Sequence, residues 1–221
     1  MTPKKLAILH TTPVTVEALK ALAAEEIGPD CEVVNLLDDS ILPELARNGG
    51  NVQAIRDRYV QYARIAESLG ADAILGACSS VGELAKAAAA EVRVPVLRID
   101  EAMAEEAVRR GGRIGVAATL ATTLAPTTRL LEEKAKELKV DVSLEPMLAG
   151  EAYKLLMAGD REGHDRVLGE ALMELHERCE TIVLAQASMA RVVAALPEEA
   201  RGSFLTSPVL GVRRVAALLR H

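Results

Sequence analysis

The chain has 221 residues, a hydrophobic fraction of 50% and a formal net charge of −6. This length suffices for one large domain or two small domains with a full core. The acidic balance, with three Tyr, one Phe and no Trp, argues against nucleic-acid binding, which requires basic patches and stacking aromatic rings. No segment has the length and apolarity of a membrane span, and the N-terminus leads into a strand without a signal-peptide core. We therefore expect a cytoplasmic protein with no membrane partner.

The three cysteines, Cys31, Cys78 and Cys179, are widely spaced and form no C-x-x-C pair. This pattern indicates neither a disulfide framework nor a zinc site, so a reducing compartment is expected. Cys31 opens a predicted strand and Cys179 closes a predicted helix, which favours a structural role for both.

Apolar runs alternate with helical periodicity through the first half of the chain. The segment 37–50 is acidic and irregular, and we expect it to be a loop that acts as a lid. The predicted strands of this half are 6–9, 31–36, 73–77 and 94–97, and the predicted helices are 14–27, 51–69, 80–90 and 100–110.

The stretch around Cys78 organises this half. Residues 73–77 are short and uncharged, as in a strand buried on both faces of a parallel sheet, and Ser80 with Glu83 has the S-x-x-E spacing of a capping box. Cys78 is therefore predicted to lie at the carboxyl end of a strand, directly before a helix. Unpaired backbone N–H groups there favour an anion and a thiolate, and Ser79 and Ser80 add donors.

The second half repeats this order. Its predicted strands are 113–117, 141–145 and 181–184, and its helices are one that ends at 138, a helical region 150–178 broken near 159–160, one that ends at 196 and one at 208–219.

Equal spacing in the two halves indicates an internal duplication: His10 and Cys78 are 68 residues apart, and so are Ala118 and Gln186. We predict an α/β fold with two quasi-symmetric parallel-sheet halves, 1–112 and 113–221, with the last helix free to pack back on the first half. Ligands of such sheets bind beyond the carboxyl ends of the strands. Four polar loops are expected to meet there in a cleft between the halves: 10–12, 78–80, 119–123 and 186–188.

Several segments together resemble the aspartate/glutamate/hydantoin racemase superfamily, over nearly the whole chain. They are Gly76-Ala77-Cys78-Ser79-Ser80, the run 113–123, the run 183–189 and Thr206-Ser207-Pro208-Val209-Leu210-Gly211. The resemblance implies two α/β halves that each present a cysteine and that hold the substrate carboxylate with backbone amides and Ser/Thr hydroxyls. In the family, one thiolate removes the proton next to the carboxylate and the other thiol returns a proton to the opposite face.

Cys78 matches the first cysteine of the family, whereas the position of the second is occupied by Gln186. A carboxamide has no comparable acid/base strength, so this chain resembles one-cysteine members such as arylmalonate decarboxylase. We therefore predict a cofactor-independent isomerase, or secondly a decarboxylase-type lyase, acting through an enediolate. The predicted catalytic pair is Cys78 and Gln186, and the predicted substrate-binding residues are His10, Thr11, Ser79, Ser80, Thr119, Thr122, Thr123, Ala187 and Ser188.

An alternative of a different class is a non-catalytic protein that binds or senses a small carboxylate on the same fold. A nucleotide or phosphate enzyme is disfavoured, because no glycine-rich phosphate motif follows a strand. The expected partner is a small carboxylic acid of unspecified side chain, and a homo-oligomer stays open.

The remaining ionisable residues give weaker signals. His10 ends the first strand and is either a second base or hydrogen-bonded scaffold. Asp38 and Asp39 are interpreted as loop residues in solvent, because no histidine lies near them to complete a metal site. His164 and His176 are interpreted as solvated, and no metal is expected.

Overall fold

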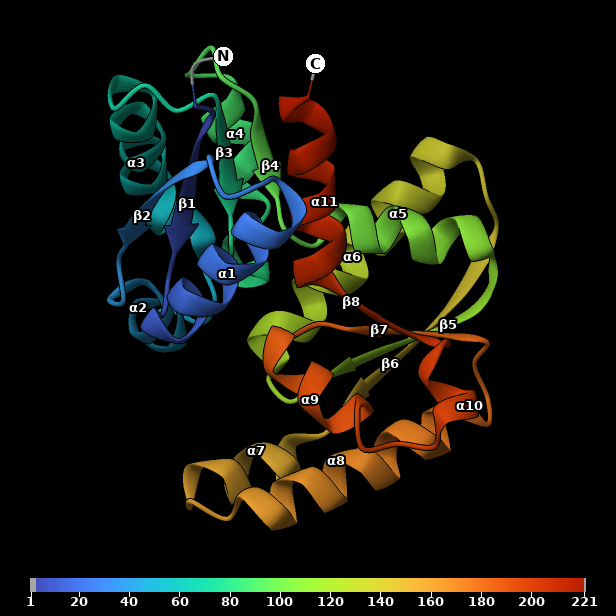
Figure 1. The fold of residues 1–221 in the computed structure, drawn as a ribbon. Helices are drawn as coiled ribbons and strands as arrows, with labels where there is room; N and C mark the ends of the chain where they lie inside the picture. The colour runs from blue at the N-terminus through green and yellow to red at the C-terminus, as the bar shows by residue number, and fades with distance from the viewer. Residues whose placement is uncertain (1–2, 221) are drawn as a thin grey trace. The chain divides into compact units, whose positions relative to one another are not determined.

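The computed structural model describes residues 3–220. They form two four-stranded parallel sheets, one in each of two compact units (Figure 1). The first unit comprises the chain up to Ile99 together with the segment from Pro208 onward, and the second comprises Asp100–Ser207. The predicted fold class, α/β with two parallel-sheet halves, is confirmed.

In the first unit, the strands lie in the order β2-β1-β3-β4. They are β1 (Lys5–His10), β2 (Glu32–Leu37), β3 (Ala73–Gly76) and β4 (Val96–Arg98). The helices are α1 (Val16–Glu26), α2 (Ile41–Arg47), α3 (Arg56–Ser68), α4 (Leu84–Ala89) and α11 (Ser207–Leu219), with short 3-10 helices η1 (Pro13–Thr15), η2 (Val52–Ile55) and η3 (Ser79–Val81).

The first sheet is buried on both faces, which explains the continuous apolar runs in its central strands. Leu6 and Ile8 of β1 pack with residues of α1 and α11 on one face. Ala7 and Leu9 pack with residues of α2, α3 and α4 on the other face. Successive side chains of one strand thus supply two separate cores.

The second unit has the same topology, with strands in the order β6-β5-β7-β8. They are β5 (Gly112–Ala118), β6 (Val142–Leu148), β7 (Thr181–Leu184) and β8 (Phe204–Thr206). The helices are α5 (Glu101–Arg110), α6 (Ala121–Leu138), α7 (Gly150–Met157), α8 (Arg161–His176), α9 (Ala190–Val193) and α10 (Glu198–Arg201), and η4 (Ala187–Met189) is a 3-10 helix.

The helices α5 and α11 each follow the last strand of one sheet and pack with the other. α5 follows β4 and contacts α6, β7 and β8 of the second unit. α11 follows β8 and places Val212 and Val215 in a core of the first unit (Figure 1). This packing places α5 in the second unit, whereas the expected halves 1–112 and 113–221 divide the sequence after it.

The predicted irregular lid at 37–50 is wrong. Residues 41–47 form α2, and its side chains Ile41 and Leu45 are 1% and 2% exposed. Two buried apolar side chains four residues apart on one helix face hold this segment against the core.

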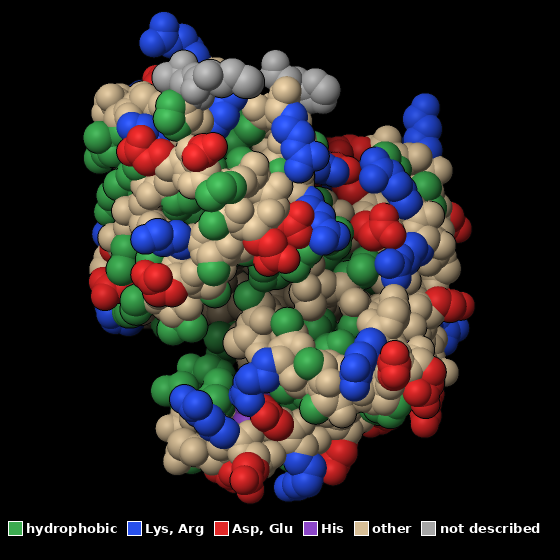
Figure 2. All heavy atoms as spheres, in the orientation of Figure 1, with side chains coloured by type: hydrophobic (Ala, Val, Ile, Leu, Met, Phe, Trp, Pro, Cys, Tyr) green, Lys and Arg blue, Asp and Glu red, His purple; other side chains and the backbone are tan. Residues whose placement is uncertain are grey.

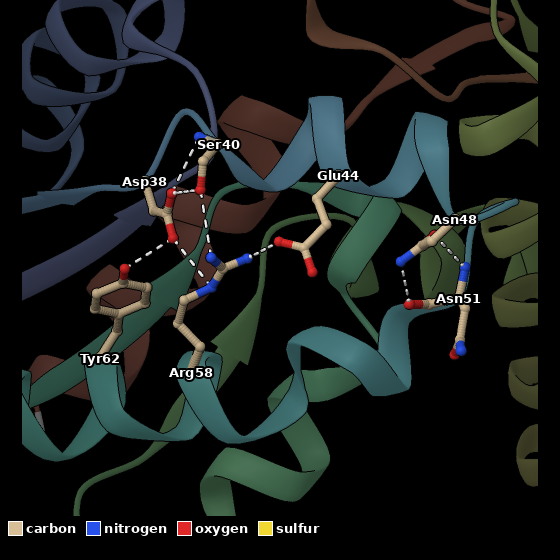
Figure 3. A network of polar contacts seen from close by, with 7 residues as sticks. All are labelled: Asp38, Ser40, Glu44, Asn48, Asn51, Arg58 and Tyr62. Atoms are coloured by element: carbon tan, nitrogen blue, oxygen red, sulfur yellow. Dashed lines mark hydrogen bonds and ion pairs between the residues drawn. The ribbon is translucent and has the colours of Figure 1, made fainter.

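Polar contacts tie the same segment to α3 (Figure 3). Asp38 accepts hydrogen bonds from Ser40 Oγ at 2.5 Å and Tyr62 Oη at 2.8 Å, and pairs with Arg58 at 3.3 Å. Arg58 also donates to Glu44 of α2 at 2.5 Å. Partial burial opposes ionisation of Asp38, but the hydrogen bonds from Ser40 and Tyr62 outweigh it and lower the pKa of this carboxyl. Among residues 3–220, no cluster of His, Cys, Asp and Glu could hold a metal ion.

Gly76, the last residue of β3, lies under the ring of Tyr59 from α3. A Cβ atom at Gly76 would stand 2.3 Å from Tyr59 Oη, whereas the next backbone atom, Leu97 O, would be 3.6 Å away. Tyr59 is 2% exposed, so its ring cannot move into solvent without opening the core.

We expect Gly76→Ala to destabilise the protein by about 1–3 kcal/mol, the usual cost of overpacking a core. In a Tyr59→Phe background the obstructing oxygen is gone, so the same substitution should cost less than half as much. Urea unfolding of the wild type, both single variants and the double variant measures this coupling. Equal costs of Gly76→Ala in the two backgrounds would show that the hydroxyl is not the obstacle.

Candidate active site

In the first unit, polar residues follow β1 and β3, which are neighbouring strands. Their parallel register pairs Leu9 with Gly76, and Ala77 N donates to Leu9 O at 3.0 Å. His10, the last residue of β1, and Cys78, which follows β3, therefore lie side by side at the carboxyl edge of the sheet. The structure thus brings His10 and Thr11 together with Cys78, Ser79 and Ser80, all named as site residues from the sequence.

Cys78 occupies the N-cap position of η3 with an extended backbone, and its side chain is partly exposed. The turn closes through Val81 N to Cys78 O at 3.3 Å and Gly82 N to Ser79 O at 3.2 Å. The N–H groups of Ser79 and Ser80 open the turn and have no acceptor within it. A thiol thus stands next to two backbone donors.

The predicted capping box is wrong. Ser80 lies inside η3, and the N-cap of α4 is Glu83, without a side-chain cap hydrogen bond. Because α4 has only six residues, its dipole is shorter than that of the helix predicted over 80–90.

His10 is 2% exposed and its two ring nitrogens are both engaged. Nε2 lies 2.8 Å from Asn35 Oδ1 and Nδ1 lies 2.8 Å from Thr15 Oγ1. Burial lowers the pKa of the ring, although the Asn35 hydrogen bond acts in the opposite direction. These contacts favour the scaffold interpretation of His10 over a free second base.

Thr11 carries a buried hydroxyl without a protein partner. The residue is 4% exposed, and its Oγ1 has no hydrogen-bond partner among the described residues. An unsatisfied buried polar group costs about 1–3 kcal/mol. A ligand that bonded to this hydroxyl would recover that free energy.

In the second unit, Thr119 and Gln186 are directly bonded. Gln186 Oε1 accepts from Thr119 N at 2.6 Å and from Thr119 Oγ1 at 3.0 Å. β5 and β7 are neighbours that pair Ala117 with Leu184, and Gln186 is the N-cap of η4. The residues that follow it, Ala187 and Ser188, are exposed.

The other two threonines predicted from the sequence, Thr122 and Thr123, lie in the first turn of α6, which follows Thr119. Thr122 is exposed, whereas Thr123 is 6% exposed and its carbonyl accepts from Thr127 Oγ1 at 2.9 Å. The N-cap residue, Leu120, makes no side-chain cap hydrogen bond. The first N–H groups of the helix instead find a backbone acceptor, because Thr123 N and Leu124 N donate to Leu120 O at 3.1 and 3.0 Å.

The two units are equivalent at these loops. Ala185 N donates to Ala117 O at 2.9 Å, as Ala77 N does to Leu9 O. Gln186 therefore corresponds to Cys78, and Thr119 to Thr11. Each pair follows the same positions of the central strands, which is the relation that the 68-residue spacing predicted.

The sequence did not identify Arg98 as a residue beside Cys78, and the interpretation of His164 as solvated is wrong. Arg98 pairs with Gly76 across the sheet and packs on the Cys78 turn, since a Cβ at Gly82 would be 2.6 Å from Arg98 Nη2. The feature of the sequence that could have identified Arg98 is a single charged residue at the end of an apolar strand. His164 is not solvated: it is 3% exposed and lies 2.7 Å from Asp165 through Nδ1, and Asp165 also binds Arg191.

Charges of both signs are interspersed over the face shown in Figure 2. Within residues 3–220, no helix combines the length and hydrophobicity needed to cross a membrane.

The sequence model of the family described as Asp/Glu/Hydantoin racemase matches residues 8–218, which confirms the resemblance seen in the sequence. No curated protein sequence matches.

Similar solved structures include three racemases. Glutamate racemase from Bacillus anthracis has 16% identity and a TM-score of 0.76, covering 100% of this chain and 83% of that chain. Glutamate racemase from Francisella tularensis, in complex with D-glutamate, has 15% identity and a TM-score of 0.73, covering 100% and 82%. Allantoin racemase from Klebsiella pneumoniae has 18% identity and a TM-score of 0.67, covering 98% and 88%. Identities of this size show a shared fold.

The three cysteines should differ in reactivity. Burial, followed by the charge of Glu145, raises the pKa of Cys179 to about 11, and burial raises the pKa of Cys31. We expect limited iodoacetamide at neutral pH to label Cys78 first, because thiolates are the reactive form and Cys78 lies at a partly exposed turn. Peptide mass spectrometry measures this, with Cys78→Ser as the control. Labelling of Cys31 at an equal rate would contradict it.

His10 should make stability depend on pH. The folded-state pKa of His10 lies below the ordinary value of 6.5. The neutral ring therefore makes its full contribution to the free energy of unfolding above pH 6.5, and this contribution is lost as the pH falls from 6.5 toward the folded-state pKa. We expect the free energy of unfolding to decline over this range, and less steeply in His10→Gln. Urea unfolding at a series of pH values tests this. Parallel pH profiles for the two proteins would rule out His10 as the cause.

Proposed function

Because the chain belongs to the Asp/Glu/hydantoin racemase family, we propose that it acts without a cofactor at the carbon next to the carboxylate of a small acid. The family is described as one of racemases, which are isomerases, so the predicted enzyme class is confirmed at that level. The identity of the acid/base group, the enediolate intermediate and the substrate are the parts proposed here.

The observation that carries the proposal is the set of groups around Cys78. The thiol stands at the carboxyl edge of the sheet with the N–H groups of Ser79 and Ser80 beside it. The buried hydroxyl of Thr11 follows the neighbouring strand and has no hydrogen-bond partner within residues 3–220. A base next to several donors for an oxyanion is the arrangement that proton abstraction from a carboxylic acid requires.

In the proposed reaction, the Cys78 thiolate removes the proton from the α-carbon. The electron pair of the broken C–H bond moves into the carboxylate, which becomes an enediolate. The donors of Ser79, Ser80 and Thr11 stabilise the charge that develops on the oxygens, usually the largest contribution to such catalysis. The thiol then returns a proton to the carbon.

Gln186 limits what this chemistry can produce. A racemase must deliver protons to both faces of the planar intermediate, and the position that corresponds to Cys78 in the second unit holds a carboxamide bonded to Thr119. An amide neither accepts nor donates a proton at the required rate. One-sided proton exchange is therefore favoured over efficient racemisation, and a lyase would use the same site to protonate an enediolate left by loss of carbon dioxide.

A second candidate is a non-catalytic protein that binds or senses a small carboxylate. The specific feature that favours it is this replacement, because the hydrogen-bond donors for a carboxylate remain without a second acid/base group. Binding of an acid without any exchange at its α-carbon would distinguish this candidate from the enzyme.

We expect the wild-type protein in D₂O to introduce deuterium at the α-carbon of a small carboxylic acid, while racemising aspartate and glutamate poorly. Cys78→Ser should reduce the exchange by about 10²–10⁴-fold, the usual contribution of a general base. Gln186→Cys should increase exchange and racemisation, because it restores a thiol on the second strand. NMR for deuteration and chiral chromatography over a panel of amino, hydroxy and dicarboxylic acids measure both.

The matched control is Cys31→Ser, which changes a thiol remote from the proposed chemistry and should leave exchange unaltered. Efficient racemisation of an amino acid by the wild type would refute the one-thiol mechanism and require another second base. Undiminished exchange in Cys78→Ser would remove Cys78 from the reaction.

A further inference from the structure

The contact between Gln186 and Thr119 has an unambiguous direction. The backbone N–H of Thr119 can only donate, so the side-chain atom 2.6 Å from it must be the oxygen of the carboxamide. The same oxygen accepts from Thr119 Oγ1 at 3.0 Å. The side-chain NH₂ group of Gln186 can therefore donate hydrogen bonds to other acceptors.

Two donors that converge on one oxygen form the type of position that binds a carboxylate or enolate oxygen. Thr119 is 6% exposed, so its donors are held in a site that is largely withdrawn from solvent. In this chain the position is filled by a neutral oxygen of the protein itself.

The equivalent position of the first unit is open. Thr11 follows β1 as Thr119 follows β5, and it is similarly buried at 4% exposure. Its Oγ1 has no hydrogen-bond partner among residues 3–220. The residue that corresponds to Gln186 is Cys78, whose shorter side chain carries no oxygen. One threonine is therefore closed by its own chain, and its counterpart is available.

We propose that Gln186 is a specificity residue whose carboxamide oxygen closes the Thr119 oxyanion position, so that the Thr11 position receives the ligand carboxylate. This inference rests on the proposed function, because it takes the ligand to be a small carboxylic acid. Of the two equivalent threonine positions, one remains open. The ligand class is accordingly small carboxylic acids that bind through the Thr11 hydroxyl.

The test is a titration of isotopically labelled protein with sodium acetate at constant ionic strength, followed by amide NMR. In the wild type, the amide of Thr11 should shift with acetate and that of Thr119 should not. In Gln186→Ala, the Thr119 donors are released and their amide should respond as well. In Gln186→Glu, which keeps an oxygen at the same reach, the Thr119 amide should again be unresponsive.

Two further measurements do not depend on the folding of Gln186→Ala. Amide exchange of Thr119 in the wild type should be slow, since its N–H is bonded to Gln186. Thr11→Val should weaken acetate binding by about ten-fold, the loss expected for a hydrogen bond to a charged group.

A response of Thr119 to acetate in the wild type, or rapid exchange of its amide, would overturn the inference. So would a folded Gln186→Ala in which Thr119 ignores acetate, or unchanged binding in Thr11→Val. The proposed function fails on a different observation, the absence of deuterium at the α-carbon of any acid, and that result would leave the titration pattern as it stands.

Discussion

The parallel pairing of each unit's two central strands is the constraint on which the candidate site depends. In both units, one more backbone hydrogen bond joins the central strands beyond their last paired residues. Ala77 N, after β3, donates to Leu9 O, and Ala185 N, after β7, donates to Ala117 O. The next residue of the chain then leaves the sheet beside the loop of the neighbouring strand. A shift of the register by one residue would send Ile74 and Leu75 each into the core that the other now occupies, and would displace Cys78 from its place beside the loop after β1. The register is held because both faces of these strands are buried.

The sequence predicted those features that local chemistry determines. The strand at 181–184 was predicted at the bounds it has, because an apolar, β-branched run stands between polar segments. The position of Cys78 after β3 and that of Gln186 after β7 followed from the same pattern. Thr11 and Thr119 could be named as candidates, but nothing local told them apart, since the difference lies in the partner that each meets across neighbouring strands.

Tertiary packing determined the features that the sequence did not reveal. α2 contains Pro43 and follows the acidic residues Asp38 and Asp39, which favour a loop. Burial of Ile41 and Leu45 nevertheless stabilises this segment as a helix. β8 has only three residues and was missed, because so short an apolar run carries little signal without the neighbouring strand. Ser80 and Glu83 have the spacing of a capping box, but the turn closed by Cys78 O shifts the start of the helix past Ser80. His10 is paired by Asn35, a residue of the neighbouring strand.

The two units have kept one architecture while their loops have diverged in chemistry. A duplicated fold offers two equivalent positions for an acid/base group and two for an oxyanion, and a symmetric pair suits a reaction that treats both faces of an intermediate alike. Here one loop has a thiol and a buried hydroxyl that meets no partner in the described part of the chain, and the other has a carboxamide that accepts hydrogen bonds from the threonine of the neighbouring loop. In the proposed mechanism, glutamine in place of a thiol thus changes two properties at once: it removes an acid/base group, and its oxygen occupies the two donors of Thr119. The substitution leaves the supporting sheet unaltered, since Ala185 N donates to Ala117 O as Ala77 N does to Leu9 O.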